Sequence, residues 1–164
     1  MSEDLNFAYP DEVIRFVARF DRGEYWLAHE ELEELWLRQG DDASKGLIHL
    51  AAALVHLERG NRRGAAKKLE SGLNYLRRSP AKVHGLDLEA ISDAMELLLE
   101  GLSSLPIAAG RRREAEGLMG FLREHGFQLA PWFAGIVGED VVGTSELPYR
   151  VRRYGEGYRI GTKR

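Results

Sequence analysis

A histidine and a glutamate one helical turn apart, His29 and Glu33, are the residues whose types and spacing best suit chemistry in this sequence. On a helix spanning residues 23–36, both fall inside an apolar arc and not on the charged face. An imidazole and a carboxylate beside Trp26 and Trp36 either satisfy each other in a core or form a site. The pattern leaves both alternatives open.

The helix that carries this pair has two chemically distinct faces. The apolar arc consists of Tyr25, Ala28, Leu32, Leu35 and Trp36 and is widened by Trp26 and Leu37. The opposite face carries the other acidic residues, Glu24, Glu30, Glu31 and Glu34. A run of charges on one helical face is typical of a face in contact with water, so we expect these four carboxylates to be solvated.

A second helix, residues 46–59, is apolar on almost every side, which indicates that other helices enclose it. His49 and His56 are seven residues apart and point the same way, and Ala52 and Ala53 between them leave room for a close partner. Seven helical residues separate two backbones by about 10.5 Å, too far for both rings to bind one ion at Zn–N lengths of about 2.0 to 2.1 Å. At most one of these histidines therefore joins any single metal site.

These spacings predict an enclosed polar pocket in which His29 and Glu33 from one helix meet His56 from another. Polar groups in apolar surroundings need partners, because leaving one unsatisfied costs about 1 to 3 kcal/mol. The candidate pocket residues are Trp26, His29, Glu30, Glu33, Trp36 and His56.

The function that this pattern favours first is a noncatalytic binding or scaffold domain, whose partner is an unidentified protein or small molecule. The sequence contains no phosphate-binding loop and no nucleophile motif. In this interpretation the histidines and the glutamate either bind the ligand or form a hydrogen-bonded core network that fixes how the helices pack.

The alternative is a metal-dependent enzyme, for example a hydrolase, in which His29, Glu33 and His56 bind a divalent metal ion. Glu30 or His49 would then help to transfer protons. Two features argue against this function. His29 lacks the second histidine at i+4 that a zincin helix needs, and no Glu-x-x-His pair typical of di-iron bundles occurs. A divalent metal is the cofactor that these residue types would suit.

The composition is that of a soluble globular protein, since 44% of the 164 residues are hydrophobic and 30% are charged. This length corresponds to about one domain. Cysteine is absent, which excludes disulfides, thiolate metal sites and cysteine nucleophiles. The sequence shows no apolar run of membrane-spanning length and no signal-peptide pattern, so we expect a cytoplasmic protein without a membrane partner.

Helical periodicity extends from Pro10 to His125, so we expect an all-α antiparallel bundle of five or six helices with no strand in this range. Asp41 or Asp42 and Asp87 are suited to cap the helices that follow them. The expected helices begin near Pro10, Gly23, Gly46, Arg62, Leu88 and Arg111. Their inward stripes include Val13, Phe16, Val17, Phe20, Ala65, Leu69, Leu73, Leu76, Leu88, Ile91, Met95, Leu98 and Leu102.

The helix at residues 62–78 begins with four basic residues, Arg62, Arg63, Lys67 and Lys68. Such a cluster suits phosphate binding. Cations at the start of a helix oppose its dipole, however, and usually lie in solvent, so we expect these four side chains to be solvated.

An internal repeat relates residues 23–36 to residues 60–73 at an offset of 37 residues. The matching pairs are Gly23/Gly60, Ala28/Ala65, Leu32/Leu69 and Glu33/Glu70. Helix, glycine turn and helix is similar to the hairpin of tetratricopeptide repeats, and two copies predict two packed α-hairpins. The second copy has Ala66 where the first has His29, so hairpin packing does not by itself require this histidine.

Two motifs in the first half of the chain carry a family resemblance. The first is Gly23-Glu24-Tyr25-Trp26-x-Ala28-His29-Glu30-x-x-Glu33-x-x-Trp36. The second is Gly46-Leu47-Ile48-x-x-Ala51-Ala52-Ala53-x-x-His56-x-x-x-Gly60-Asn61-x-x-Gly64-Ala65. Over about residues 16–76 the chain resembles domain-of-unknown-function family 309. The resemblance implies a small all-helical bundle without an established activity, and the family pattern is matched at His29, Glu30, Glu33, Trp36 and His56.

The formal net charge of −3 is unevenly distributed, because residues 149–164 carry +5 and the remaining 148 residues carry −8. A basic segment on an acidic body is suited to bind nucleic acid, to dock on its own body or to stay mobile. Its basic residues are Arg150, Arg152, Arg153, Arg159, Lys163 and Arg164.

The C-terminal segment also differs from the helical part in its pattern. We expect a helical domain at residues 1–126 and a glycine-rich, basic extension at residues 127–164. Residues 149–154 and 158–160 flank Gly-Glu-Gly, which predicts a short β-hairpin or else an irregular segment. A lone hairpin is marginally stable, so we expect its deletion to leave the melting temperature nearly unchanged.

Overall fold

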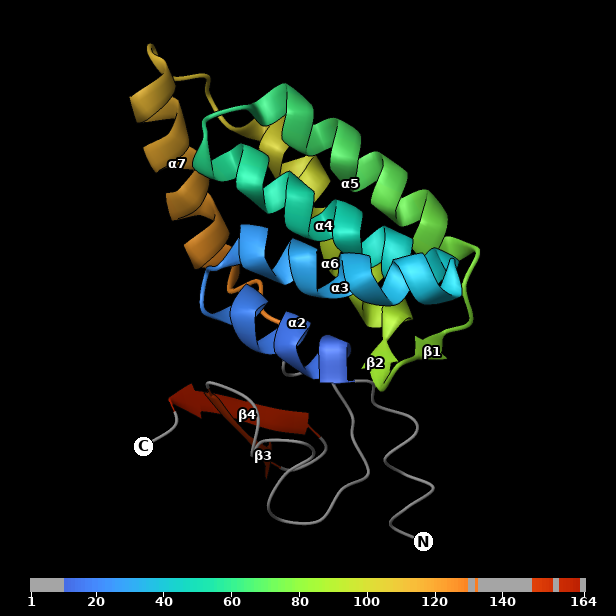
Figure 1. The fold of residues 1–164 in the computed structure, drawn as a ribbon. Coiled ribbons are helices and arrows are strands. Elements are labelled where there is room, and N and C mark those ends of the chain that lie inside the picture. The colour runs from blue at the N-terminus through green and yellow to red at the C-terminus, as the bar shows by residue number, and fades with distance from the viewer. Residues whose placement is uncertain (1–10, 130–131, 133–148, 155–156, 163–164) are drawn as a thin grey trace, which may run out of the picture.

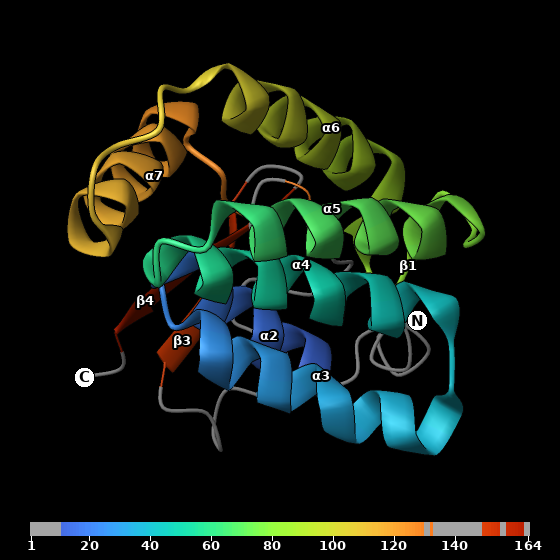
Figure 2. The same cartoon turned by 90° about the horizontal axis from the view of Figure 1, so that it is seen from above.

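Three antiparallel helix pairs stacked in chain order form the body of the fold in a computed structural model, which describes residues 11–129, 132, 149–154 and 157–162 (Figure 1). Figure 2 shows the order of the pairs from α2 and α3, through α4 and α5, to α6 and α7. The predicted all-α bundle is therefore confirmed. The helices of the described residues are α2 (Asp11–Asp21), α3 (Tyr25–Gln39), α4 (Asp42–Glu58), α5 (Arg62–Arg77), α6 (Leu88–Ser104) and α7 (Arg111–His125).

The first two pairs are the two α-hairpins that the internal repeat predicts. Gly23 and Gly60 occupy equivalent places in their turns, with φ of 81° and 72°, a region that favours glycine. The paired repeat residues Ala28, Ala65, Leu32 and Leu69 have no exposed surface. Equivalent positions thus serve the same packing role in both hairpins.

Helix α4 lies at the centre of the stack, between α3 and α5 and beside α7. Eleven of its residues are buried, as expected for a helix that is apolar on almost every side. Its contact with α5 is close at Gly46, where an added Cβ would lie 2.6 Å from Leu76 Cδ2 and 3.1 Å from the Gly72 carbonyl oxygen. The missing side chains allow the two backbones to approach.

Side chains cap three helices at their first turn. Asp41 Oδ2 accepts the backbone N–H of Ser44 at 2.9 Å before α4, and Asp87 Oδ1 accepts that of Ala90 at 3.1 Å before α6. Asn61 Oδ1 accepts the backbone N–H of Gly64 at 2.9 Å before α5. The predicted caps at Asp41 and Asp87 are confirmed, and each satisfies an N–H group without an intrahelical partner.

A two-residue hairpin interrupts the helices, so the prediction that Pro10 to His125 contains no strand is wrong. Strand β1 (Lys82–Val83) pairs with β2 (Leu86–Asp87) around His84 and Gly85, whose φ values are 55° and 78°. Positive φ at both central residues is typical of tight hairpin turns. His84 Nε2 lies 3.1 Å from Asp41 Oδ2, which joins this hairpin to the start of α4. Strands this short leave no periodic signal in a sequence.

The C-terminal hairpin is confirmed. Strand β3 (Tyr149–Tyr154) pairs with β4 (Gly157–Thr162) in an antiparallel register that aligns Val151 with Ile160, and the hairpin backbone lies beside α2. The core extends past the boundary expected at residue 126, because Leu129 is fully buried and its N–H donates to Asp21 at 2.6 Å. No helix in the described part of the chain has the length and apolarity needed to cross a membrane.

Two predictions about solvated charges are wrong. Glu31 was expected in solvent, but its side chain is 16% exposed and pairs with Arg15 at 2.9 Å and Arg19 at 2.8 Å. These ion pairs join α3 to α2. Arg62, expected to be solvated, is 19% exposed and bonds Glu114.

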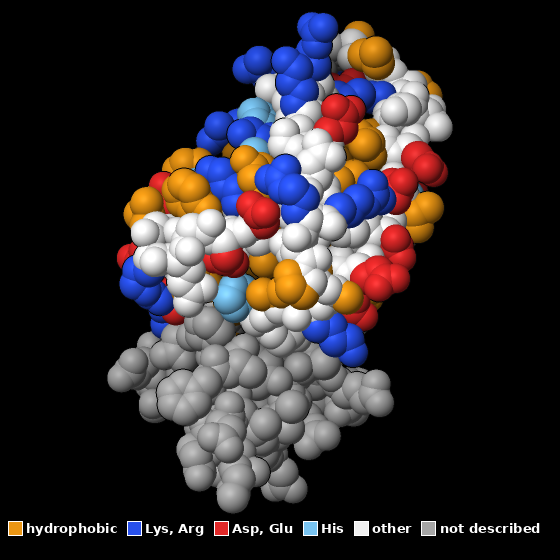
Figure 3. All heavy atoms as spheres, turned by 90° about the vertical axis from the view of Figure 1, so that its right-hand side faces the viewer, with side chains coloured by type: hydrophobic (Ala, Val, Ile, Leu, Met, Phe, Trp, Pro, Cys, Tyr) orange, Lys and Arg blue, Asp and Glu red, His pale blue; other side chains and the backbone are white. Residues whose placement is uncertain are grey.

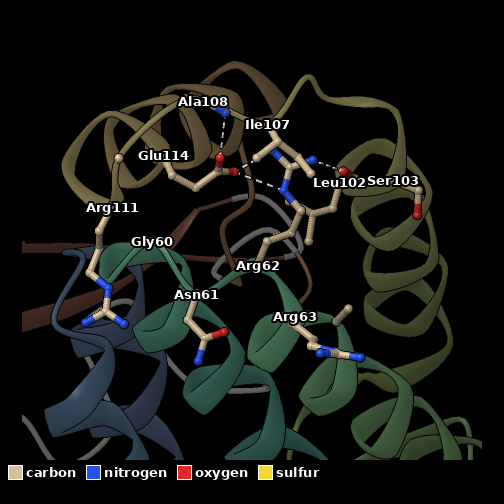
Figure 4. A pocket seen from close by; sticks show the side chains of 12 residues that line it. Gly60, Asn61, Arg62, Arg63, Leu102, Ser103, Ile107, Ala108, Arg111 and Glu114 are labelled. Atoms are coloured by element: carbon tan, nitrogen blue, oxygen red, sulfur yellow. Dashed lines mark hydrogen bonds and ion pairs between the residues drawn. The ribbon is translucent and has the colours of Figure 1, made fainter.

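Arg62 and its bonding partners join α5 to α6 and α7 (Figure 4). Its Nε donates to Glu114 Oε1 at 3.0 Å, and its terminal nitrogens donate to Glu114 and to the carbonyl groups of Leu102, Leu105 and Pro106. A guanidinium has five N–H donors, and all five are used here. These carbonyls end α6, where a positive charge is favoured by the helix dipole.

Candidate functional site

The predicted histidines lie on a surface formed by three adjacent helices, α3, α4 and α5. Each residue of this surface is partly or fully accessible, and neighbouring helices contribute residues one or two turns apart. We call it the histidine surface and define it as Trp26, His29, Glu33 and Trp36 on α3, Lys45, His49 and His56 on α4, and Lys68 and Tyr75 on α5.

On α3 the predicted pair is present but not enclosed. His29 Nδ1 lies 3.5 Å from Glu33 Oε2, and the His29 ring stacks on Trp26 with centroids 5.1 Å apart. The Trp26 residue is 54% exposed and the Glu33 side chain 50%, so the prediction of a closed pocket walled by Trp26 is wrong. Leu37, expected to widen the apolar arc, is 72% exposed. The buried arc of α3 is therefore narrower than expected, because Trp26 and Leu37 are left exposed although α2 and α4 both pack on this helix.

His49 on α4 is held uncharged by its surroundings. Its Nδ1 is buried without a hydrogen-bond partner among the described residues, and its ring centroid lies 5.3 Å from that of Tyr75. Burial lowers the pKa of His49 to about 4, with further contributions from the charges of Lys68 and Lys45 and from His29. At pH 7 this imidazole is neutral.

His56 has a tautomer fixed by its neighbour Asn61. Asn61 Oδ1 accepts the N–H of Gly64, so the Asn61 amide nitrogen, 3.1 Å from His56 Nδ1, is the donor in this pair. Nδ1 is therefore the acceptor, and the ring proton is on Nε2. A Cβ on Gly64 would lie 2.8 Å from His56 Nδ1, so a glycine is needed here. Burial and the charges of Lys68 and Arg59 lower the pKa of His56.

Lys68 is the residue that connects the three histidines. Burial is the largest cause of the lowered pKa of His29, His49 and His56, and Lys68 contributes to the lowering for each of them. For His29, Glu33 and Glu30 act in the opposite direction. Lys68 therefore lies within electrostatic reach of rings from two other helices. It sits one turn from Gly64 and two turns from Tyr75 on α5.

Lys45 supplies a second positive charge to the histidine surface. Its Nζ lies 4.1 Å from the centroid of the Trp36 ring, a cation–π contact. It also lowers the pKa of His29 and His49. The predicted wall residue Trp36 thus contacts a cation, and it is partly buried between α3 and α4.

The structure places the expected metal ligands differently from the prediction. His29 Nδ1 contacts Glu33, whereas His56 Nδ1 is hydrogen-bonded to Asn61. Within the residues that the structure describes, no group of three or more histidine and acidic side chains is arranged to hold a metal ion. His49, and not His56, is the histidine whose pKa is affected by His29. Glu30 is exposed and acts on His29 through its charge alone.

The matched part of the chain contains nearly all of this surface. Residues 13–68 match a family described as a domain of unknown function (DUF309). We call these residues the DUF309 segment. No curated protein matches the chain. The DUF309 segment runs from α2 into α5 and ends at Lys68, so every residue of the histidine surface except Tyr75 lies inside it.

The sequence-based prediction of the site omits Lys45 and does not place Lys68 beside the histidines. Lys45 and His49 are one turn apart on α4, and His56 follows two turns later, so a helical projection places them on one face. Lys68 was instead grouped with three neighbouring basic residues, and the sequence does not show that it faces α4. On the face in Figure 3, Lys, Arg and His side chains lie next to hydrophobic ones, while several acidic side chains gather along the right-hand edge and others lie singly across the face.

Proposed function

We propose that the chain is a noncatalytic binding domain, and that the histidine surface holds an anionic group of its ligand, a carboxylate or a phosphate. The observation that carries this proposal is the position of Lys68 within reach of three histidines whose pKa values are all lowered. A cation surrounded by neutral imidazoles is favourable for a bound anion, because charge-assisted hydrogen bonds are about twice as strong as neutral ones.

The hydrogen-bonding groups of the surface support the same ligand chemistry. His56 carries its proton on Nε2, since Nδ1 accepts from Asn61, so it is a donor. Lys45 and Lys68 add donors and positive charge, and neither forms an ion pair with an acidic side chain in the described part of the chain. The half-exposed ring of Trp26 offers an apolar contact beside these donors. A ligand that combines an anion with an apolar or aromatic group would use both.

The protonation states favour binding over catalysis. A general base works best when its pKa is near the working pH, and a His49 with a pKa of about 4 is a weak base at neutral pH. The three-residue metal site that the enzyme hypothesis needs is also not formed by the described side chains. Among the described residues, Nδ1 of His29 and Nδ1 of His49 are buried without a hydrogen-bond partner, although His29 Nδ1 lies 3.5 Å from Glu33 Oε2. An unsatisfied buried nitrogen costs free energy, which a bound ligand recovers if it supplies the missing hydrogen bond.

Two further expectations stay predictions. The basic side chains of residues 149–164 fall outside the described side chains, so nucleic-acid binding by Arg150, Arg152, Arg153, Arg159, Lys163 and Arg164 is untested. We also propose a cytoplasmic location, which is consistent with the lack of a membrane-spanning helix among the described residues.

The proposal is tested by NMR titration of the histidine ring signals with inorganic phosphate and with acetate. We expect both anions to shift the signals of His49 and His56 and to raise the pKa of His49, because a bound anion stabilises the imidazolium form. Lys68→Met should abolish these shifts. Lys67→Met is the matched control, because Lys67 is exposed on the adjacent position of α5. Equal anion binding by both variants, or no shift with either anion, would overturn the proposal.

A further inference from the structure

A second concave region lies on another side of α5, where the starts of α5 and α7 meet the end of α6. It is a cavity of about 680 Å³ (Figure 4). Sites that bind small molecules usually measure about 300 to 1,000 Å³, so this cavity is large enough for an organic ligand. It lies apart from Lys68 and Lys45, and Asn61 stands between it and His56.

The Arg62–Glu114 pair forms the back of this cavity and is not available to a ligand. All five N–H donors of Arg62 are used within the protein, and Glu114 Oε2 accepts the N–H of Ala108 at 2.8 Å. In Figure 4 the Arg62 side chain runs through the centre of the view toward Glu114. The two charges compensate each other, so they add no net charge to the lining.

The charge that remains at the cavity is positive. Arg63 and Arg111 line it, both are exposed, and neither forms an ion pair with another side chain of the described residues. Figure 4 shows them on either side of Arg62. Their long side chains can swing toward the cavity, because no ion pair with the described residues holds them. Two such arginines lining one cavity are suited to a carboxylate or phosphate, which a guanidinium binds through two parallel hydrogen bonds.

The rest of the lining is mainly apolar. Leu102 is buried in the floor, and Ile107 at the rim is 81% exposed, the largest exposure of any bulky hydrophobic residue in the described chain. Ala66 and Ala108 also line the cavity, and their small side chains leave space for a ligand. A large apolar side chain in water gains free energy when a ligand covers it.

We propose that this cavity binds a small amphipathic anion, in which a carboxylate or phosphate contacts Arg63 and Arg111 and an apolar group packs on Ile107 and Leu102. The two kinds of lining are complementary to the two parts of such a ligand. None of the residues that line this cavity belongs to the histidine surface, although Arg63 and Ala66 lie on α5, the helix that also carries Lys68.

Octanoate is a suitable probe, and methyl NMR locates where it binds. We expect octanoate to shift the methyl signals of Ala66, Ile107 and Ala108 in a saturable way. Octanol, which has the same chain length without the charge, and inorganic phosphate, which lacks the apolar chain, should each bind more weakly. Shifts that spread over the surface, or equal binding of octanol and octanoate, would overturn the proposal.

Three variants separate the arginines of the cavity from unrelated charges. Arg63→Gln and Arg111→Gln should each weaken octanoate binding roughly tenfold, since each removes one charge-assisted contact. Arg112→Gln is the matched control, because Arg112 lies on the same turn of α7, is 94% exposed in its side chain and pairs with Glu116 instead of lining the cavity. An equal loss in all three variants would show a nonspecific charge effect and would refute the site. Lys68→Met should leave octanoate binding unchanged, which separates this site from the histidine surface.

Discussion

At the scale of single residues, His49 makes the stability of the fold depend on pH. Its pKa is lowered from 6.5 to about 4 in the folded chain, so the unfolded chain takes up the proton first as the pH falls. The contribution of His49 to stability is therefore complete above pH 6.5 and is lost as the pH falls toward 4. The ring is partly accessible, so we expect a loss of roughly 1 to 2 kcal/mol and not the full value of the shift.

This prediction is checked by urea unfolding at several pH values between 4 and 7. His49→Phe should flatten the dependence, because Phe cannot take up a proton, although His29 and His56 contribute in the same direction. His125→Phe is the control on the exposed end of α7. If the free energy of unfolding depends on pH equally in His49→Phe and in the unsubstituted protein, the prediction is wrong.

At the scale of helices, Arg62 determines how firmly α6 and α7 are attached to α5. Arg62→Ala leaves the buried carboxylate of Glu114 and the carbonyl groups at the end of α6 without their donor, which we expect to cost about 2 to 4 kcal/mol. Arg62→Lys should recover part of this loss, because an ammonium has three donors instead of five. Chemical denaturation measures both changes.

The control for this prediction is Arg63→Ala, one residue further along α5. Arg63 is exposed and has no ion pair among the described residues, so its removal should change stability by no more than about 0.5 kcal/mol. Equal stability of Arg62→Ala and Arg63→Ala would show that the Arg62 contacts do not join the helices.

Replacing either of two helical glycines by alanine should change the stability of the protein in opposite directions. An alanine at Gly117 in α7 meets nothing within 4 Å, so Gly117→Ala should stabilise the protein by about 0.5 to 1 kcal/mol. At Gly64 a Cβ would lie 2.6 Å from Asn61 Nδ2 and 2.8 Å from His56 Nδ1, so Gly64→Ala should destabilise it and break the His56–Asn61 hydrogen bond. Thermal unfolding gives the sign of each change, and His56 ring signals report the hydrogen bond.

The sequence predicted what depends on local periodicity. The stripes at Val13 to Phe20 and Leu88 to Leu102 identified their helices because each repeats an apolar residue every turn. The hairpin at His84 was not predicted, because its strands have two residues each and show no alternation. At the site, the spacing of His29 and Glu33 predicted that their side chains would meet. The neighbours of Lys68 and the exposure of Trp26 depend on how three helices pack, which periodicity does not encode.

At the scale of the whole molecule, the C-terminal hairpin lies against α2. Ile14 and Ala18 of α2 are almost fully buried although they lie away from the side occupied by Phe16 and Phe20. Because the backbone of β3 and β4 is beside this helix, we now expect deletion of residues 149–164 to lower the melting temperature, contrary to the sequence-based expectation. A change of 1 kcal/mol corresponds to roughly 2 to 4 °C at this chain length. Calorimetry on the full and shortened chains measures this change. Identical melting temperatures would contradict the prediction and would support the expectation that the hairpin contributes little to stability.

The hydrogen bonds of Arg62 also bear on whether the DUF309 segment can exist by itself. Arg62 lies within residues 13–68, yet every group that accepts its hydrogen bonds lies between Leu102 and Glu114. A fragment that ends after α5 would carry a guanidinium with no acceptor from its own chain. We therefore expect the isolated segment to be less stable than it is in the full chain, where α6 and α7 supply these acceptors. A relative that kept this arginine but lacked α6 and α7 would have to obtain the acceptors from a second subunit or leave the arginine in solvent.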